Sequence, residues 1–291
     1  MKHQIKPSHH VPRDLVITAR DYHFDFADAF AKNRYWHGNN PVTTHFFNAL
    51  QSTFPEGERF FIDAARDAVK ALGEENLDPE LRQQVKGFIR QEAAHGREHE
   101  VWCQALIDAG YSEIEDQIQQ LKQLRLWARE HMHVNLRIAA TAGAEHYTAS
   151  LAHLFLYKRP DLLDAAEPPI KAAFVYHALE EIEHKAVCFD LFTAVSGAYW
   201  LRALGLLMSA FDVMRLTRKR HIYLLKRDGL WNWKNRVSAW QFIWSSRGIA
   251  TQLIPYTLRY LKPDFHPWQT DERNKIHERY GALLSALEAA N

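Results

Sequence analysis

Two glutamates in this chain are each followed by a Glu-x-x-His motif at nearly the same distance, 34 residues in one case and 36 in the other. The two sets are Glu58 with Glu92-Ala-Ala-His95, and Glu145 with Glu181-Ile-Glu-His184. Because residues three apart on a helix share a face, the carboxylate and the imidazole of each motif can reach one metal ion. Carboxylate and imidazole donors suit iron, manganese or zinc. The pattern therefore predicts six ligands around two metal ions.

The spacing within each set predicts a helical hairpin. A helix rises ~1.5 Å per residue, so a stretch of this length can run along one side of a small domain and return. Two such hairpins packed together form a four-helix bundle with the ligands in its interior. Apolar neighbours such as Phe60, Phe88 and Phe174 oppose the alternative, which is that the charged residues lie on solvated helix faces. We therefore predict an all-α protein with a dinuclear metal site in a four-helix bundle.

The 3.6-residue periodicity and the turn residues predict where the helices lie. The bundle helices are expected at about 42–72, 79–109, 128–158 and 169–196, with shorter helices near 112–127 and 270–290. The first helix could be bent at Pro55, and Gly197 is expected to end the last bundle helix. The predicted organisation is an irregular N-terminal arm at 1–41, the metal-binding bundle at 42–197, and a C-terminal helical extension packed on the bundle at 198–291. Residues Leu15–Thr18 could form a short strand within the arm.

Three more histidines lie near the motifs. His177 is four residues before Glu181 and so shares its face, and we favour it as a seventh ligand over a packed core histidine. His99 is four residues after His95, and for it we favour a place beside the ligands or in the core. His146 lies about 100° around the helix from Glu145 and is not expected to bind metal.

Other side chains on the same helices are candidates for catalysis. Thr141 lies one turn before Glu145, so its hydroxyl could hydrogen-bond an oxygen species on the metals, or instead bond back to its own helix. Tyr176 and Tyr147 could donate protons or electrons, although both residues are also typical of a core. The small side chains of Ala139–Ala144 allow either close helix packing or a cavity beside the metals.

Composition excludes several classes of function. The net charge of +1 gives no electrostatic basis for binding nucleic acid, and two cysteines, Cys103 and Cys188, exclude a disulfide framework and favour buried thiols. The N-terminal segment has no apolar core typical of a signal peptide, so we expect a cytoplasmic protein. The apolar stretch at 198–215 contains Arg202 and Asp212, which favours a packed helix over a membrane span and leaves peripheral membrane contact open.

The ligand order resembles that of the ferritin-like di-iron carboxylate superfamily, and the extra His177 is similar to a histidine of the para-aminobenzoate N-oxygenases. Over roughly residues 15–270, the chain also resembles the bacterial family called "predicted metal-dependent hydrolase". The segments that carry this second resemblance are Thr53–Phe61, Gln91–His99 and Glu180–Lys185. The resemblance to the di-iron proteins implies a ferritin-like bundle and the ligands Glu58, Glu92, His95, Glu145, His177, Glu181 and His184.

Three functions remain open at this point. We favour a di-iron oxidase or oxygenase that uses O2 and acts on a small apolar or aromatic substrate. Its electrons would come from an external donor, because no flavin or nicotinamide motif is visible in the sequence. The alternative is a metal-dependent hydrolase with a hydroxide bridging two metals, for which Glu180 or Glu183 are candidate bases. A metal-storage or structural role is the third. A homodimer is expected because most oligomers of such proteins are symmetric dimers.

Overall fold

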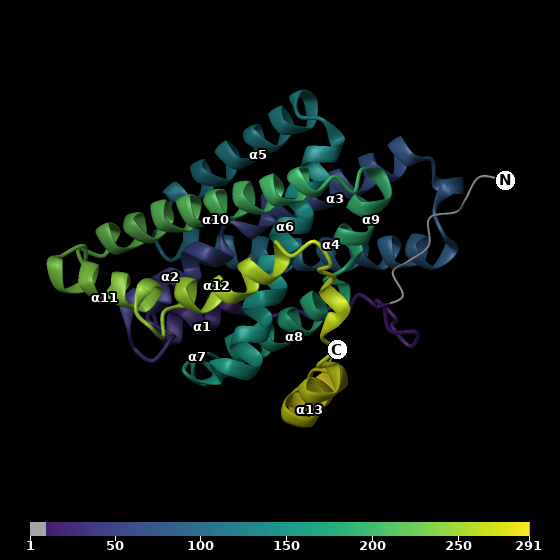
Figure 1. Ribbon diagram of the computed structural model, residues 1–291. Coiled ribbons are helices and arrows are strands. Elements are labelled where there is room, and N and C mark those ends of the chain that lie inside the picture. The colour runs from purple at the N-terminus through teal and green to yellow at the C-terminus, as the bar shows by residue number, and fades with distance from the viewer. Residues whose placement is uncertain (1–9, 291) are drawn as a thin grey trace.

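The computed structural model describes residues 10–290, and within them it contains helices and no β-strand (Figure 1). The prediction of an all-α fold is confirmed. Residues 1–9, which hold much of the segment that we tested for a signal peptide, lie outside the described residues. None of the described helices is long and apolar enough to cross a membrane, and the expected cytoplasmic location stays a prediction.

Four helices carry the two sets of metal-binding motifs. They are α3 (Phe54–Leu72), α4 (Pro79–Asp108), α6 (Val134–His153) and α8 (Pro168–His184). Helix α3 packs against α4 and α6, and α8 packs against the same two helices, so the four form a closed bundle. Pro79 and Pro168 stand at the first positions of α4 and α8, where a missing N–H costs nothing.

The first predicted helix is two helices. Helix α2 (Pro41–Gln51) ends before α3 begins, and Ser52 and Thr53 separate them. The break follows from Pro55, which has no N–H to donate and whose ring would clash with the carbonyl of Gln51 in a continuous helix. Asn40 caps α2 by accepting hydrogen bonds from the backbone N–H groups of Val42 and Thr43.

The prediction of one helix over 169–196 is wrong, because α8 ends at His184 and α9 (Val187–Val195) starts in a new direction. The C-terminal segment packs at this break. Lys185 donates to the carbonyl of Thr270 at 2.7 Å, and Asp190 lies 2.9 Å from the ring of His266. Gly197 then ends the α9 region with φ of 62°, as predicted.

The boundaries around α6 also differ from the prediction. Helix α5 (Glu113–His131) is longer than expected, α6 begins at Val134 rather than near 128, and its last turn widens into a π-helix at Leu154–Lys158. A short helix α7 (Pro160–Asp164) follows before α8.

The small residues of α6 serve helix packing. Helix α10 (Tyr199–Arg227) lies along α6 and α2, and two glycines allow this contact. A Cβ atom on Gly143 would lie 2.7 Å from Leu206 Cα, and one on Gly205 would lie 2.4 Å from the carbonyl carbon of Ala139. Of the two expectations for Ala139–Ala144, close helix approach is therefore the one observed.

The remaining C-terminal helices surround the bundle. Helix α11 (Trp233–Trp244) packs on α12 (Ile249–Tyr260), α12 contacts α6, and α13 (Arg273–Ala290) packs on α8. In Figure 1 α10, α11 and α12 lie on the face towards the viewer. The predicted helix near 270–290 is confirmed as α13.

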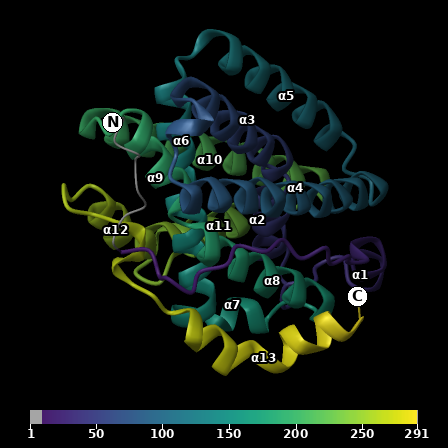
Figure 2. The same cartoon turned by 90° about the vertical axis from the view of Figure 1, so that its right-hand side faces the viewer.

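The N-terminal arm is part of the packed structure. Before α1 (Phe26–Lys32) it runs extended between α4 and α8, as Figure 2 shows in purple. The carbonyl of Thr18 accepts a hydrogen bond from Gln91, and Gly87 leaves room for Ile17, whose carbonyl oxygen would be 2.6 Å from an added Cβ. The segment Leu15–Thr18 is extended but pairs with no strand among the described residues.

Asp228 at the end of α10 joins three separate parts of the fold. The hydroxyls of Tyr35 and Tyr111 donate to its carboxylate at 3.0 Å, His45 Nε2 lies 2.9 Å away, and Arg34 forms an ion pair with it. The Asp228 side chain is only 2 % exposed. Burial disfavours the ionised carboxyl, but the contacts with His45 and Arg34 outweigh it and hold the pKa of Asp228 well below its ordinary value.

We expect Asp228→Asn to lower the free energy of unfolding at neutral pH by about 3 kcal/mol, because it removes the charge that a buried set of donors needs. Since the native pKa is depressed, this contribution is full above about pH 4 and is lost as the pH falls further. Urea denaturation of both proteins from pH 7 to pH 3 measures the difference, which should shrink with acid. Asp212→Asn, on the exposed part of the same helix, should change stability by less than about 0.5 kcal/mol. Equal losses in both variants would contradict this role.

Candidate metal centre

The four glutamates of the two motif sets meet in the interior of the bundle. Glu58 comes from α3, Glu92 from α4, Glu145 from α6 and Glu181 from α8, and each is at most 4 % exposed. His95 and His184 are fully buried beside them. The structure therefore brings together all six residues of the repeat, from segments far apart in the sequence.

The donor atoms fall into two overlapping groups. Glu92 belongs both to a group with Glu58 and His95 and to a group with Glu145 and His184, and within each group the nearest donor atoms lie within 4.8 Å of one another. Glu181 also faces both sides, since one of its oxygens is 3.0 Å from His177 and the other is 3.4 Å from His184. The carboxylates that reach both sides are therefore those of Glu92 and Glu181.

The two groups differ in their imidazoles. On the side of Glu58 and His95 there are two further groups: His177 with His95 and Glu181, and His99 with Glu58 and His177. His99 Nε2 lies 3.1 Å from Glu58. Sequence reasoning favoured a place for His99 beside the ligands or in the core, and the structure puts it among the candidate donors. On the other side His184 is the one imidazole grouped with Glu92 and Glu145 in the described part of the chain.

The charges of the cluster are poorly compensated by the protein. Burial raises the pKa of Glu58 and Glu145 to about 7, and burial together with Glu145 raises that of Glu92. Burial also disfavours ionised Glu181, but His184 outweighs it and holds the pKa of Glu181 below its ordinary value. Carboxylates at this density keep protons unless cations take their place.

The residues present fit a pair of metal ions. Six carboxylate oxygens in the cluster lack a hydrogen-bond partner among the described residues: Glu58 Oε2, both of Glu92, both of Glu145 and Glu181 Oε2. The same holds for imidazole nitrogens of His95, His99 and His184. Buried polar atoms are almost always satisfied, and a convergent set of carboxylate oxygens and imidazole nitrogens is one that cations would satisfy.

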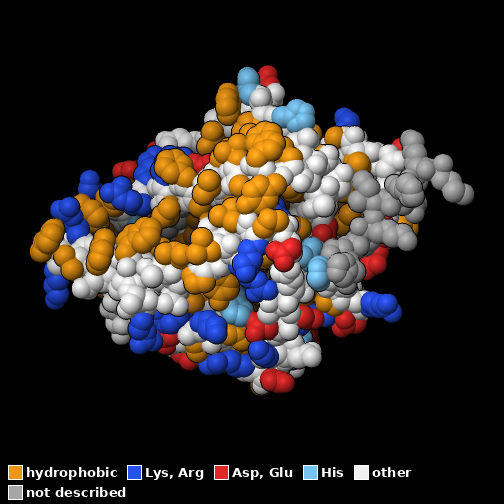
Figure 3. Space-filling model, in the orientation of Figure 1, with side chains coloured by type: hydrophobic (Ala, Val, Ile, Leu, Met, Phe, Trp, Pro, Cys, Tyr) orange, Lys and Arg blue, Asp and Glu red, His pale blue; other side chains and the backbone are white. Residues whose placement is uncertain are grey.

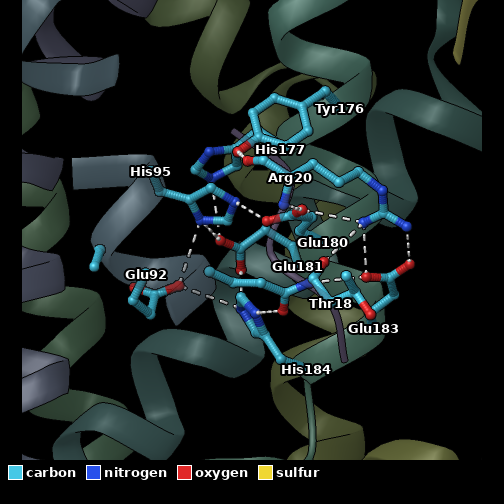
Figure 4. A network of polar contacts seen from close by, with 12 residues as sticks. Thr18, Arg20, Glu92, His95, Tyr176, His177, Glu180, Glu181, Glu183 and His184 are labelled. Atoms are coloured by element: carbon cyan, nitrogen blue, oxygen red, sulfur yellow. Dashed lines mark hydrogen bonds and ion pairs between the residues drawn. The ribbon is translucent and has the colours of Figure 1, made fainter. Parts of the chain in front are cut away.

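An outer layer of polar residues orients the histidines (Figure 4). His184 Nδ1 lies 2.9 Å from Gln91 Oε1, and His95 Nε2 lies 3.0 Å from Glu180. These contacts leave His184 Nε2 and His95 Nδ1 to face the carboxylates. Fixing one ring nitrogen of a ligand histidine sets its tautomer and raises its basicity.

Arg20 from the N-terminal arm anchors this outer layer. Its guanidinium donates to Glu180 at 3.1 Å and to Glu183 at 2.9 and 2.7 Å, and its backbone N–H also donates to Glu180. Glu183 further accepts from Gln91 at 2.8 Å. Both glutamates that we had considered as bases are thus engaged outside the cluster. Sequence reasoning missed Arg20 and Gln91, and no local spacing pointed to them.

The candidate catalytic residues lie close by, with their hydroxyls turned elsewhere. Thr141 is fully buried on α6, and its hydroxyl donates to the carbonyl of Arg137 at 3.0 Å, which is the back-bonding alternative. The ring of Tyr176 packs edge-on against His95, but its hydroxyl donates to the carbonyl of Arg20. Their catalytic roles stay predictions.

Two other expectations concern residues outside the cluster. His146 faces away, with Nε2 3.0 Å from the carbonyl of Tyr256. Cys103 and Cys188 are both buried and free, as predicted.

A family model described as "Predicted metal-dependent hydrolase" matches residues 18–271 of the chain. The chain belongs to this family. The matched region contains the whole cluster together with Thr18 and Arg20, so it includes the arm that anchors the outer layer. No curated protein and no solved structure matches the chain significantly. The family description supports metal dependence; the identity and number of the metals remain predictions.

Reconstitution tests the ligand assignment. The purified protein should bind about two Fe(II), Mn(II) or Zn(II) ions per chain, and Glu92→Ala should bind fewer than about one, because Glu92 reaches both groups of donors. Bound metal should also raise the melting temperature of the native protein and leave that of Glu92→Ala nearly unchanged. Elemental analysis after desalting and a thermal scan give both readouts. Glu98→Ala, a buried glutamate of the same helix that pairs with His23, is the matched control and should keep both ions. Full metal content in Glu92→Ala would overturn the assignment.

The outer layer makes a separate prediction. Gln91→Leu should weaken metal binding by about 10- to 100-fold, since His184 loses the contact that fixes its ring. Competition with a chelator of known affinity measures the change. Gln84→Leu, two turns earlier on α4, is the control, because the Gln84 side-chain nitrogen has no hydrogen-bond partner among the described residues. Similar losses in both variants would mean that the helix, not the contact, was disturbed.

Proposed function

We propose that this protein is an enzyme whose buried cluster binds two divalent metal ions and uses them for hydrolysis. The observation that carries the metal site is the set of unpartnered carboxylate oxygens from four helices, together with imidazole nitrogens on both sides. The family description supports hydrolysis over other metal chemistry. Two ions at such a site would supply Lewis acidity and lower the pKa of bound water.

The residues of the chain hold the ions, orient the ligands and exclude water. Glu58, Glu92, Glu145 and Glu181 would hold the ions together with the imidazoles of the cluster. Aromatic rings cover the cluster: Phe88 stands edge-on to His184 and Phe54 packs against His99. Apolar walls of this kind keep the polar interactions inside strong.

The substrate would reach the centre on the side of His177. This histidine is the least buried donor, with 18 % of its side chain exposed. A cavity of about 50 Å³ lies against His177 and Glu181, and its other walls include Leu50, Phe54 and Phe155. A substrate group that enters there is surrounded by carbon, so an apolar substrate fits the site best.

A second candidate is the O2-dependent di-iron oxidase or oxygenase. Two observations favour it: carboxylate with imidazole donors suits iron, and Glu180 and Glu183, the expected bases of a hydrolase, are both held by Arg20. The ferritin-like classification, a role for Thr141 or Tyr176, and an external electron donor belong to this proposal. The expected homodimer is independent of either reaction.

The two candidate reactions can be distinguished by the metal ion that supports activity. Zn(II)- or Mn(II)-loaded protein should hydrolyse long-chain p-nitrophenyl esters equally well under argon and in air, and Glu92→Ala should lose at least about 100-fold in kcat/KM. An oxygen electrode and a spectrum of the Fe(II)-loaded protein test the second candidate. Oxygen uptake by the Fe(II) form without ester turnover by the Zn(II) form would refute hydrolysis. If neither reaction occurs with the metal-loaded protein, the role is metal storage or structure.

A further inference from the structure

A large hollow lies on the face formed by α10, α11 and α12. Its volume is about 670 Å³, which falls within the ~300–1,000 Å³ of small-molecule sites. Large apolar side chains both line it and remain exposed, among them Phe211, Met214, Trp233 and Trp240. Figure 3 shows the resulting apolar area across this face, with Lys and Arg at its edge. We call this hollow the α10–α12 groove.

The groove is positively charged and carries no compensating acid. Arg215, Arg218 and Arg236 line it, and no Asp or Glu does so among the described residues. Arg215 pairs with Asp212, whereas Arg218 and Arg236 have no carboxylate partner in the described part of the chain. Arg236 lies over the rings of Trp231 and Trp233, which leaves its N–H groups available. An anionic group is the complementary ligand.

The groove also contains an unpartnered polar atom. Thr217 is 5 % exposed and lines the groove, yet its hydroxyl has no hydrogen-bond partner among the described residues. A buried hydroxyl without a partner is disfavoured, and a ligand or water normally satisfies it. Thr217 therefore offers a hydroxyl to a ligand in the groove.

Two leucines connect the groove with the metal centre. Leu50 and Leu151 line both the groove and the small cavity against His177 and Glu181. Both side chains are apolar, and Leu151 is only partly buried. The wall that a ligand would cross between the two cavities is therefore apolar at these positions.

We propose that the α10–α12 groove binds the substrate of this enzyme, an amphiphile with one long apolar chain and an anionic group, and that the chain runs past Leu50 and Leu151 towards the metal centre. The anionic group pairs with Arg218 and Arg236. In a hydrolytic reaction, the bond that water cleaves is an ester or amide within the chain, away from the anionic group, and its cleavage gives an acid and an alcohol or amine. This inference rests on the proposed function for the role of the metals, but binding in the groove does not depend on it.

Binding of monomeric fatty acids to the metal-loaded protein tests the groove. Saturated carboxylates from C10 to C16 should bind one per chain and change tryptophan fluorescence. Affinity should rise about fourfold per methylene, which corresponds to ~0.8 kcal/mol of buried CH2, until the groove is filled. The alcohol of equal length should bind at least about tenfold more weakly than the acid, since a charge-assisted contact is lost.

Variants locate the ligand. Replacing both arginines, Arg218→Gln with Arg236→Gln, should remove the preference for acid over alcohol, while Arg129→Gln, far along the chain on α5, should keep it. Trp240→Ser should weaken binding of all chain lengths and, as an exposed site, should not disturb folding. Equal affinities for acid and alcohol in the native protein would overturn the proposal.

A paramagnetic measurement tests the direction of the chain without using activity. A nitroxide near the methyl end of stearic acid should relax faster in Mn(II)-loaded than in Zn(II)-loaded protein, and a nitroxide near the carboxyl group should respond much less. Leu151→Trp should suppress the methyl-end effect by closing the passage, and Leu151→Ile should preserve it. Equal effects for both labels would refute the path to the metals.

The remaining outcomes separate this inference from the proposed function. Saturable fatty-acid binding by protein that holds no metal would refute the metal function and leave the groove standing. Metal-loaded protein without such binding would refute the groove alone. If Trp240→Ser instead weakens binding to anionic vesicles, or converts a dimer to monomers, and no monomeric amphiphile binds, then the face contacts a membrane or a second copy and the proposal fails.

Discussion

The enclosure of four carboxylates in one dry space is the constraint on which this structure depends. Ionised carboxylates in an apolar interior cost several kcal/mol each unless cations or hydrogen bonds compensate them. In the described part of the chain, the ion pairs of these four carboxylates are with imidazoles and not with lysine or arginine. Each bundle helix contributes one of the four carboxylates, so packing the helices together also brings the four charges together. Metal ions would resolve this conflict, as would protons held by the carboxylates.

A second layer of buried carboxylates lies next to the cluster, and an arginine of the same chain compensates their charge. Glu180 and Glu183 add two more carboxylates next to the cluster, and Arg20 balances both. The arm that carries Arg20 therefore has an electrostatic reason to lie between α4 and α8. In this arrangement the two residues control the orientation of His95 and Gln91, and hence the chemistry, from outside the reacting centre.

The sequence predicted those features that depend on local spacing. Residues three or four apart share a helix face wherever the helix is, so the ligand set could be found without knowing how the helices pack. Contacts between distant segments have no such signal: Arg20 and Glu180 are 160 residues apart. The two helix breaks also differ in whether a local sequence signal predicts them. Pro55 marked the first break, whereas nothing between Glu181 and Val187 marked the second, which is stabilised by contacts of Lys185 and Asp190 with the C-terminal segment.

The close contact of α6 with α10 ties the metal centre to the groove. Gly143 lies two residues before Glu145, and it meets the backbone of α10 at Leu206 with no space for a side chain. Ser209 strengthens this contact by donating to the carbonyl of Ala140 at 2.6 Å. Further along, the same helix α10 forms a wall of the groove with Thr217. Because packed backbones yield little, the distance between the groove and Glu145 is set by the helices themselves and not by flexible side chains. A ligand held in the groove would therefore meet the metal centre at a fixed depth, and the length of its apolar chain would decide which of its bonds reaches the ions.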